Sequence, residues 1–175
     1  MFTNKKQKNM KKLLVLLLIG LSFNGFSQQK KLTWYTDVKQ ATEVSIKTEK
    51  PMYLFFTGSD WCGWCKKLVR EVFTKEEFKI WAEKNIVLVE IDFPRRENLK
   101  KLDQNTKNQN NELMQIFGPI YQQNTGRRMG FPTGFFVNPK VKDGKVDLVS
   151  EIIGIQGYVA GGPQVWIGTA NRYLK

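Results

Sequence analysis

The chain has 175 residues, of which 41% are apolar and 13% aromatic, and it carries a formal net charge of +12. This length and apolar content suffice for one compact core and are short for two domains, so we expect one domain. The chain contains two cysteines and no histidine, which is too few ligands for a closed tetrahedral zinc site without recruited carboxylates.

The N-terminal residues have the order of a secretory signal peptide. Five lysines precede the apolar run LLVLLLIGL at 13–21, and the small residues Gly25 and Ser27 follow it. Nine apolar residues are too few to cross a bilayer core, which needs about 20. We therefore expect a signal peptide over 1–27, a mature domain over 28–175 without stable membrane insertion, and export to the periplasm or the outer surface.

The expected mature chain is moderately basic, because loss of five lysines lowers the net charge from +12 to +7. Its most polar stretch, PRRENLKKLDQNTKNQNN at 94–111, mixes acids with bases and has no aromatic residue on which a nucleic-acid base could stack. We expect a solvated insertion there and no nucleic-acid partner.

Strands and helices alternate in the first part of this domain. A short strand is expected at 31–35, followed by a helix over 37–48 that Thr36 or Asp37 caps. The run PMYLFFTG at 51–58 is apolar throughout, which is typical of a strand buried on both faces of a sheet.

A further helix and strand follow the cysteines. Thr74 and Glu77 have the spacing of a capping box, which predicts the start of a helix. NIVLVEIDF at 85–93 is another buried strand. The order strand, helix, strand predicts a parallel pair joined by a right-handed crossover, and hence an α/β fold.

The C-terminal third predicts a helix, an antiparallel strand pair and a last helix. ELMQIF at 112–117 predicts a helix that is disturbed at Gly118–Pro119. GFPTGFFVNP at 130–139 predicts a strand. Asp143–Gly144 predicts a hairpin turn. We expect VDLVSEIIG at 146–154, which follows this turn, to be the antiparallel partner of the strand at 130–139.

Both cysteines lie in the stretch SDWCGWCKKL at 59–68, two residues apart. They could form a redox pair, half of a metal site or a structural disulfide. The missing histidines argue against the metal site, and a bridge across two residues closes too small a loop to stabilise the fold much. Outside the cytoplasm no glutathione pool keeps thiols reduced, and the redox pair explains most of the pattern.

The predicted start of a helix at the cysteines favours redox chemistry. Unpaired backbone N–H groups and the positive end of the helix dipole favour a thiolate at Cys62, which makes it a nucleophile. Cys65, one turn further along, is placed to attack the mixed disulfide and release the partner. Trp61 and Trp64 flank the pair and offer apolar area to a partner chain, although Trp61 also fits ordinary core packing.

The stretch LFFTGSDWCGWCKKL at 54–68 resembles the thioredoxin superfamily in its aromatic strand, its Trp before the first cysteine, its Cys-x-x-Cys motif and the lysine that follows. Together with FKIWAEKNIVLVEIDFP at 78–94, it resembles exported thioredoxin-like proteins of Bacteroidetes-type bacteria, related to the disulfide reductase branch. The resemblance implies a thioredoxin fold. Its central mixed sheet of four to five strands is flanked by helices, with the polar insertion before the helix that precedes the cis-proline strand.

The second motif that carries the resemblance is GFPT at 130–133. In thioredoxin-like folds a cis-proline opens the strand that faces the active site, and Pro132 matches it by position. The resemblance implies that Phe131 presents its backbone to an extended substrate beside the cysteines. X-Pro bonds are the ones for which the cis form is accessible, and the alternative is a trans proline that merely begins a strand.

One position departs from the thioredoxin pattern. Thioredoxins carry a buried aspartate as proton acceptor for the second cysteine, and the position aligned on Trp61 is Phe56 here. Glu90 is the candidate replacement, because a buried carboxylate with a raised pKa can shuttle a proton. Asp60, expected in an exposed loop, and Asp92, expected at the end of its strand, are weaker candidates.

These features predict an exported thiol:disulfide oxidoreductase that acts on protein thiols and disulfides. It holds no metal and uses no cofactor beyond a Cys62–Cys65 disulfide. The resemblance implies the reducing direction and a membrane-embedded electron donor, but Gly63–Trp64 differs from the Gly-Pro of thioredoxin and leaves the reduction potential open. The alternative is a non-catalytic module that holds extended chains on the apolar rim of Trp61, Trp64 and Phe131.

Overall fold

The computed structural model describes residues 32–142 and 144–175 of the chain. The expected signal peptide over 1–27 therefore lies outside the described residues, and so does Asp143 of the expected hairpin turn. Within the described ranges, no helix is both long and apolar enough to cross a membrane.

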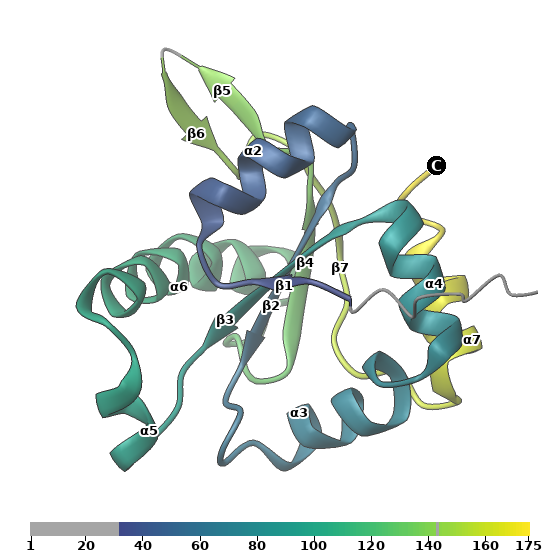
Figure 1. Cartoon of the computed structure of the whole chain (residues 1–175), viewed down its shortest axis with the longest axis horizontal. Coiled ribbons are helices and arrows are strands. Elements are labelled where there is room, and N and C mark those ends of the chain that lie inside the picture. Colours follow the sequence, from purple (N-terminus) through teal and green to yellow (C-terminus); the bar gives the residue numbers. More distant parts are fainter. Residues whose placement is uncertain (1–31, 143) are drawn as a thin grey trace, which may run out of the picture. The chain divides into compact units, whose positions relative to one another are not determined.

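The centre of the fold is a five-stranded sheet with the strand order β1-β3-β2-β4-β7 (Figure 1). β1 and β2 run parallel to β3, whereas β4 runs antiparallel to both β2 and β7. The strands are β1 (Trp34–Tyr35), β2 (Met52–Thr57), β3 (Val87–Asp92), β4 (Thr133–Val137) and β7 (Ile152–Ile155). The predicted mixed sheet and the predicted parallel crossover are confirmed.

Helices cover both faces of this sheet. On one face lie α2 and α6, and on the other lie α3, the π-helical turn η1, α4 and α7 (Figure 1). The helices are α2 (Val38–Thr48), α3 (Gly63–Leu68), η1 (Val69–Phe73), α4 (Glu76–Asn85), α5 (Arg96–Lys101), α6 (Gln104–Thr125) and α7 (Gly162–Ala170).

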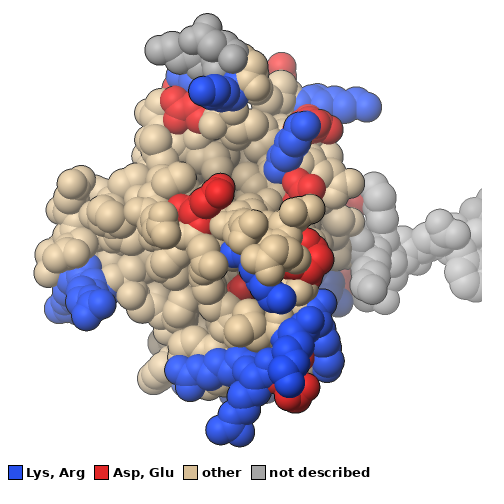
Figure 2. All heavy atoms as spheres, turned by 90° about the vertical axis from the view of Figure 1, so that its left-hand side faces the viewer, with Lys and Arg blue, Asp and Glu red and all other residues tan. Residues whose placement is uncertain are grey.

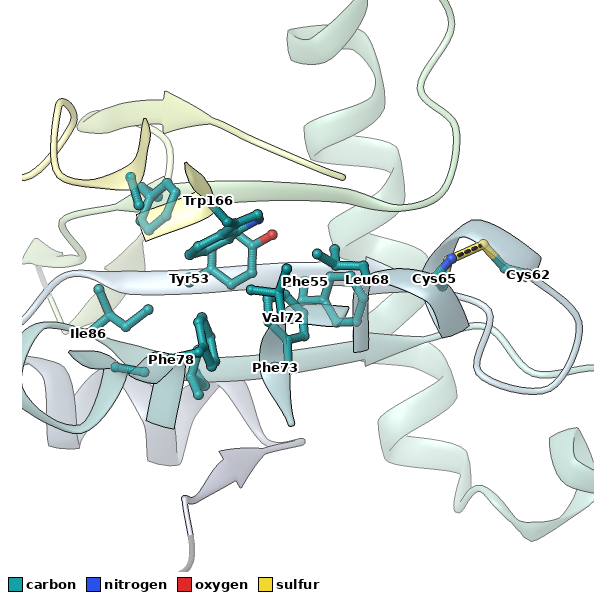
Figure 3. Close-up of a cluster of buried hydrophobic side chains, with 14 residues drawn as sticks. Tyr53, Phe55, Cys62, Cys65, Leu68, Val72, Phe73, Phe78, Ile86 and Trp166 are labelled. Carbon is teal, nitrogen blue, oxygen red and sulfur yellow. Dashed lines mark hydrogen bonds between the residues drawn. A yellow bond between two sulfur atoms is a disulfide. The ribbon is translucent and has the colours of Figure 1, made fainter. Parts of the chain in front are cut away.

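The central strand β2 is buried along its whole length, as its apolar run predicts. Its side chains alternate between two cores, because successive residues of a strand point to opposite faces. Leu54 and Phe56 pack on the α2 and α6 face, whereas Tyr53 and Phe55 pack with Trp166 on the other. Figure 3 shows this second core, with the Cys62–Cys65 pair at one end of its aromatic cluster.

The polar insertion at 94–111 is more ordered than a solvated loop. It forms α5 and the first part of α6, and the side chain of Asp103 caps α6 by accepting the N–H of Thr106 at 2.9 Å. The buried Asn110 donates to the carbonyl of Asp92 at 2.8 Å, which ties the insertion to the end of β3.

The disturbance expected at Gly118–Pro119 is absent, since α6 continues to Thr125. A proline inside a helix costs about 3 kcal/mol. Burial of Leu113 and Phe117 against the sheet offsets that cost.

Two further local expectations need correction. Thr74 does not cap α4; its hydroxyl donates to the carbonyl of Arg70 at 3.0 Å, and α4 begins after Lys75 without a side-chain cap. The stretch 140–147 does not extend the main sheet either. It forms a separate two-stranded sheet of β5 (Lys140–Lys142) and β6 (Lys145–Asp147). The antiparallel partner expected at 146–154 is confirmed in its last part, because β7 pairs antiparallel with β4.

Candidate active site

A tight turn at the end of β2 carries the chain to the cysteines. The carbonyl of Gly58 accepts the N–H of Cys62 at 2.8 Å and that of Trp61 at 3.2 Å. A Cβ atom at Gly58 would lie 2.4 Å from the Trp61 side chain, so only glycine fits this close approach. The turn therefore fixes Trp61 beside the strand end and places Cys62 at the start of α3.

Cys62 and Cys65 are joined in a disulfide, with their Cα atoms 5.2 Å apart. Cys62 is the N-cap residue of α3, and its Sγ accepts the backbone N–H of Cys65 at 3.1 Å (Figure 3). Cys62 is 5% exposed and Cys65 is 1% exposed, so Cys62 is the more exposed of the two residues. A thiolate at Cys62 would keep this hydrogen bond and gain from the helix dipole.

Trp61 is held against two other segments of the chain. Its indole N–H donates to the carbonyl of Phe93 at 2.8 Å, and its ring meets the ring of Phe131 edge to face at 5.6 Å between centroids. The Arg95 guanidinium lies 4.1 Å from the Trp61 ring centroid. The contacts of Trp61 therefore connect the redox motif to the loop after β3 and to the segment before β4.

Trp64, between the two cysteines, is 58% exposed. Its ring packs against Tyr158 with centroids 5.2 Å apart, and the Lys67 ammonium lies 5.0 Å from both ring centroids. The Tyr158 hydroxyl donates to Glu71 at 2.7 Å. Sequence reasoning missed Tyr158, because it lies far along the chain and belongs to no motif.

The Phe131–Pro132 peptide bond is cis, as the resemblance implied. Pro132 immediately precedes β4, and its carbonyl is approached by Gly157, at which a Cβ atom would lie 2.4 Å from that oxygen. Phe131 packs against the same core cluster as the two cysteines. The fold thus brings the GFPT segment to the redox motif through the contact between Phe131 and Trp61.

Phe56, the position aligned with the thioredoxin aspartate, faces away from the cysteines. It packs against Phe117 and Phe135 on the other face of the sheet. The β2 residues on the cysteine side are Tyr53 and Phe55, which pack in their cluster, and Thr57, which lines a pocket with Cys65. An aspartate at position 56 would therefore not reach Cys65 in this structure.

Glu90 is the carboxylate that shares a pocket with the redox pair. It lies opposite Phe55 in the β2–β3 ladder, and it lines a pocket of about 420 Å³ together with Cys65, Lys66 and Arg70. Burial, and secondarily the negative charge of Asp92, raise the pKa of Glu90 above its ordinary value. A carboxyl group in this state can accept and return a proton.

Asp60 and Asp92 are engaged in structural hydrogen bonds. Asp92 accepts both the N–H and the hydroxyl of Ser59, at 2.8 and 2.6 Å. Asp60 accepts the N–H of Arg95 at 3.0 Å and the side-chain amide of Asn98 at 3.1 Å. Desolvation opposes ionisation of Asp60, but these hydrogen bonds outweigh it and lower the pKa of Asp60. Neither residue is as well placed as Glu90 to serve Cys65.

Among residues 32–142 and 144–175, no group of three or more His, Cys, Asp or Glu side chains is arranged to hold a metal ion. The fold and the Cys62–Cys65 disulfide define a thiol:disulfide oxidoreductase whose redox group is its own cysteine pair. Residues 33–139 match the model of a family described as thioredoxin-like. The chain belongs to this thioredoxin-like family.

Two curated relatives are similar in sequence. The disulfide bond reductase DsbH of Chlamydia pneumoniae is 32% identical over 136 residues, which cover 78% of this chain and 69% of that protein. The thioredoxin-related protein DsbJ of Chlamydia pneumoniae is 31% identical over 109 residues. That match covers 56% of this chain but only 31% of DsbJ.

Solved structures agree with this assignment. A structure of a DsbH oxidoreductase superposes with a TM-score of 0.63 at 26% identity, covering 86% of this chain and 93% of that one. A thioredoxin from Thermus thermophilus superposes with a TM-score of 0.50 at 15% identity, covering 81% and 85% of the two chains. Because its sequence identity is only 15%, the similarity to the Thermus thermophilus thioredoxin supports the fold alone.

Proposed function

We propose that this protein is an exported thiol:disulfide reductase in which Cys62 attacks the disulfide of a partner protein and Cys65 resolves the mixed disulfide. The single observation that carries these roles is the hydrogen bond from the Cys65 N–H to the Cys62 sulfur at the start of α3. A donor at this position stabilises a thiolate and lowers the pKa of the thiol that becomes the nucleophile.

The reaction runs in two exchange steps. The Cys62 thiolate attacks one sulfur of the partner disulfide; a bond between Cys62 and that sulfur forms, and the other partner sulfur leaves as a thiolate. Cys65 then loses its proton and attacks the Cys62 sulfur, which releases the second partner thiolate and closes the Cys62–Cys65 disulfide. Two electrons pass from the protein to the partner, and the partner thiolates take up protons.

Glu90 is our candidate for the group that accepts the Cys65 proton. It shares the pocket with Cys65, and burial raises its pKa above that of an ordinary glutamate, which favours the protonated form that follows proton uptake. The proton reaches it directly or through water in that pocket.

Four residues form the proposed contact surface for the partner chain. Trp64 is the exposed member, and Trp61, Phe131 and Pro132 are half-buried, with Trp61 and Phe131 in ring contact. The resemblance of GFPT to the thioredoxin-like segment supports the backbone of Phe131 as the partner of an extended substrate segment.

The reducing direction is supported by the relative named a disulfide bond reductase. Export is supported by the lysine-rich and apolar order of residues 1–27, which we propose to be a signal peptide ahead of a periplasmic domain over 28–175. A reductase outside the cytoplasm needs electrons that have crossed the membrane. We therefore propose a membrane-embedded dithiol donor as its upstream partner.

Cysteine substitutions test the proposed roles. In an insulin-reduction assay driven by dithiothreitol, Cys62→Ser should abolish the reaction, because the attacking thiolate is gone. Cys65→Ser should instead accumulate a covalent complex with the substrate, visible as a band on a non-reducing gel. Full activity of Cys62→Ser would overturn the assignment.

The reduction potential tests the direction. We expect equilibration with a series of glutathione buffers to give a value nearer to that of thioredoxin, about −270 mV, than to that of the oxidant DsbA, about −120 mV. A value at the oxidant end would contradict the reducing direction while leaving the thiol:disulfide chemistry intact.

A further inference from the structure

Each tryptophan beside Cys62 carries a cation over its ring. The Arg95 guanidinium lies 4.1 Å from the centroid of the Trp61 ring, and the Lys67 ammonium lies 5.0 Å from that of the Trp64 ring. Cation–π contacts of this kind fix the position of a flexible charged side chain. Positive charge is therefore held over the rings of both tryptophans of the redox motif.

Further basic residues continue this surface along α3, η1 and α5. Lys66 and Arg70 line the pocket that contains Cys65. Figure 2 shows Lys and Arg side chains gathered at the lower end of the molecule, where Figure 1 places α3 and α5. We call this set the basic collar: Lys66, Lys67, Arg70, Arg95, Arg96, Lys100 and Lys101.

The acids near the collar do not cancel its charge. Segments 60–71 and 95–101 contain these seven bases and three acids, which leaves an excess of four positive charges. Two of these acids are paired with collar bases, Glu71 with Arg70 and Glu97 with Lys100, and the excess of four already subtracts them. Asp60 accepts the backbone N–H of Arg95. Glu90 and Asp92 are half-buried beside this surface, and Asp92 is bound by Ser59.

We infer that the basic collar selects partner proteins whose disulfide is surrounded by acidic side chains. The inference rests on the proposed function, because the partner must bring a disulfide to Cys62. Basic side chains around the disulfide of a competing partner would face the positive charges of Arg95 and Lys67, and the partner would be repelled. The exposed Trp64 ring, which carries Lys67, supplies the apolar contact.

The test uses three short peptides, each closed by one internal disulfide and differing only in whether Glu, Gln or Lys flanks the cysteines. The fully reduced protein is mixed with each peptide, and the single-turnover rate of peptide reduction is measured. Each rate is divided by the rate at which dithiothreitol, which is uncharged, reduces the same peptide, because this corrects for the intrinsic reactivity of the peptide disulfide. We expect the Glu peptide to react about tenfold faster than the Lys peptide at low ionic strength. This ratio should approach one at about 1 M salt, where the Debye length is about 3 Å.

Paired variants locate the effect in the collar. Lys67→Gln/Arg95→Gln should reduce the ratio of Glu to Lys rates several-fold. Lys39→Gln/Lys47→Gln removes the same charge from α2, on the other face of the sheet, and should leave the ratio unchanged. Because each ratio compares two peptides on one protein, a change in the intrinsic reactivity of Cys62 cancels.

Failure of this inference is distinguishable from failure of the proposed function. Equal rates for the Glu and Lys peptides, or a ratio that the collar variant leaves unchanged, would overturn the selection of acidic partners while the chemistry stands. No reduction of the Gln peptide would overturn the proposed function. In that case, titration of the oxidised protein with the same peptides carrying serine for cysteine still tests the collar, and equal affinities for the Glu and Lys peptides would overturn it.

Discussion

Glu90 is a carboxylate in an environment that favours its neutral form. It lies on β3 in the pocket shared with Cys65, and burial is the main reason that its pKa is raised, with the charge of Asp92 adding to the effect. A raised pKa means that the folded state binds this proton more tightly than the unfolded state does. The free energy of unfolding therefore falls as the pH rises from the ordinary value of 4.5 through the raised pKa of Glu90.

We predict that Glu90→Gln removes this part of the pH dependence and stabilises the oxidised protein at neutral pH. The slope that it removes is at most about 1.4 kcal/mol per pH unit, the limit for one proton. Urea unfolding across the acidic to neutral range measures it. Glu112→Gln, an exposed change on α6, is the control. A pH profile of Glu90→Gln identical to that of the wild type would contradict the prediction.

The same variant has a kinetic signature if Glu90 accepts the Cys65 proton. Without the carboxylate, Cys65 must lose its proton to water, so the mixed disulfide should resolve slowly at neutral pH and faster as the pH approaches that of an ordinary thiol, about 8.5. Quenched-flow measurement of its lifetime gives this profile. Glu90→Asp should restore part of the neutral-pH rate, and a purely structural role for Glu90 would leave the profile unshifted.

At the scale of elements, α2 shows how local signals set the ends of a helix. Asp37, one of the two caps that the sequence predicted, caps its start by accepting the N–H of Gln40 at 3.0 Å. Its end is less favourable, because the C-cap residue Glu49 adopts the left-handed region with φ of 55°. A residue with a Cβ atom loses about 1 kcal/mol in that conformation relative to glycine.

We predict that Glu49→Gly raises the free energy of unfolding by about 1 kcal/mol, because glycine adopts the left-handed conformation without steric cost. Urea denaturation of the two proteins at one pH is the measurement. The matched control, Glu43→Gly in the interior of the same helix, should lower stability by about 1 kcal/mol. Effects of the same sign at both positions would show that the end of α2 is not strained.

At the scale of the whole molecule, both cores meet on β2. Its backbone pairs with β3 on one side and with β4 on the other. Its side chains pack alternately in the two hydrophobic clusters. The β5–β6 hairpin, in contrast, is a separate two-stranded sheet in which Val141 and Val146 are exposed. Stability against local opening should therefore differ strongly between these two regions.

We predict that amide hydrogen exchange is slowest in Met52–Thr57 and Val87–Asp92 and faster by orders of magnitude in β5 and β6. Exchange followed by mass spectrometry or NMR on the oxidised protein measures this order. Equal protection of the hairpin and β2 would contradict the assignment of the core to the central strands.

The sequence by itself determined the features that depend on neighbouring residues. The order of apolar strands and helices predicted an α/β fold, and the Cys-x-x-Cys spacing favoured a redox pair. The resemblance of this motif and of GFPT to the thioredoxin superfamily implied the thioredoxin fold and the cis-proline. Asp37 could be predicted as a candidate cap beside Thr36, because a cap contacts residues within one helical turn.

Only the tertiary structure decided which distant residues meet at the site. It turned Phe56 away from the cysteines and brought Tyr158 to Trp64 and Arg95 to Trp61. It also gave the polar insertion a helical structure anchored through Asn110. The physical reason is that these contacts join segments that are separate in the chain. Strand order and helix packing decide which side chains meet, and the spacing of residues along the sequence does not record them.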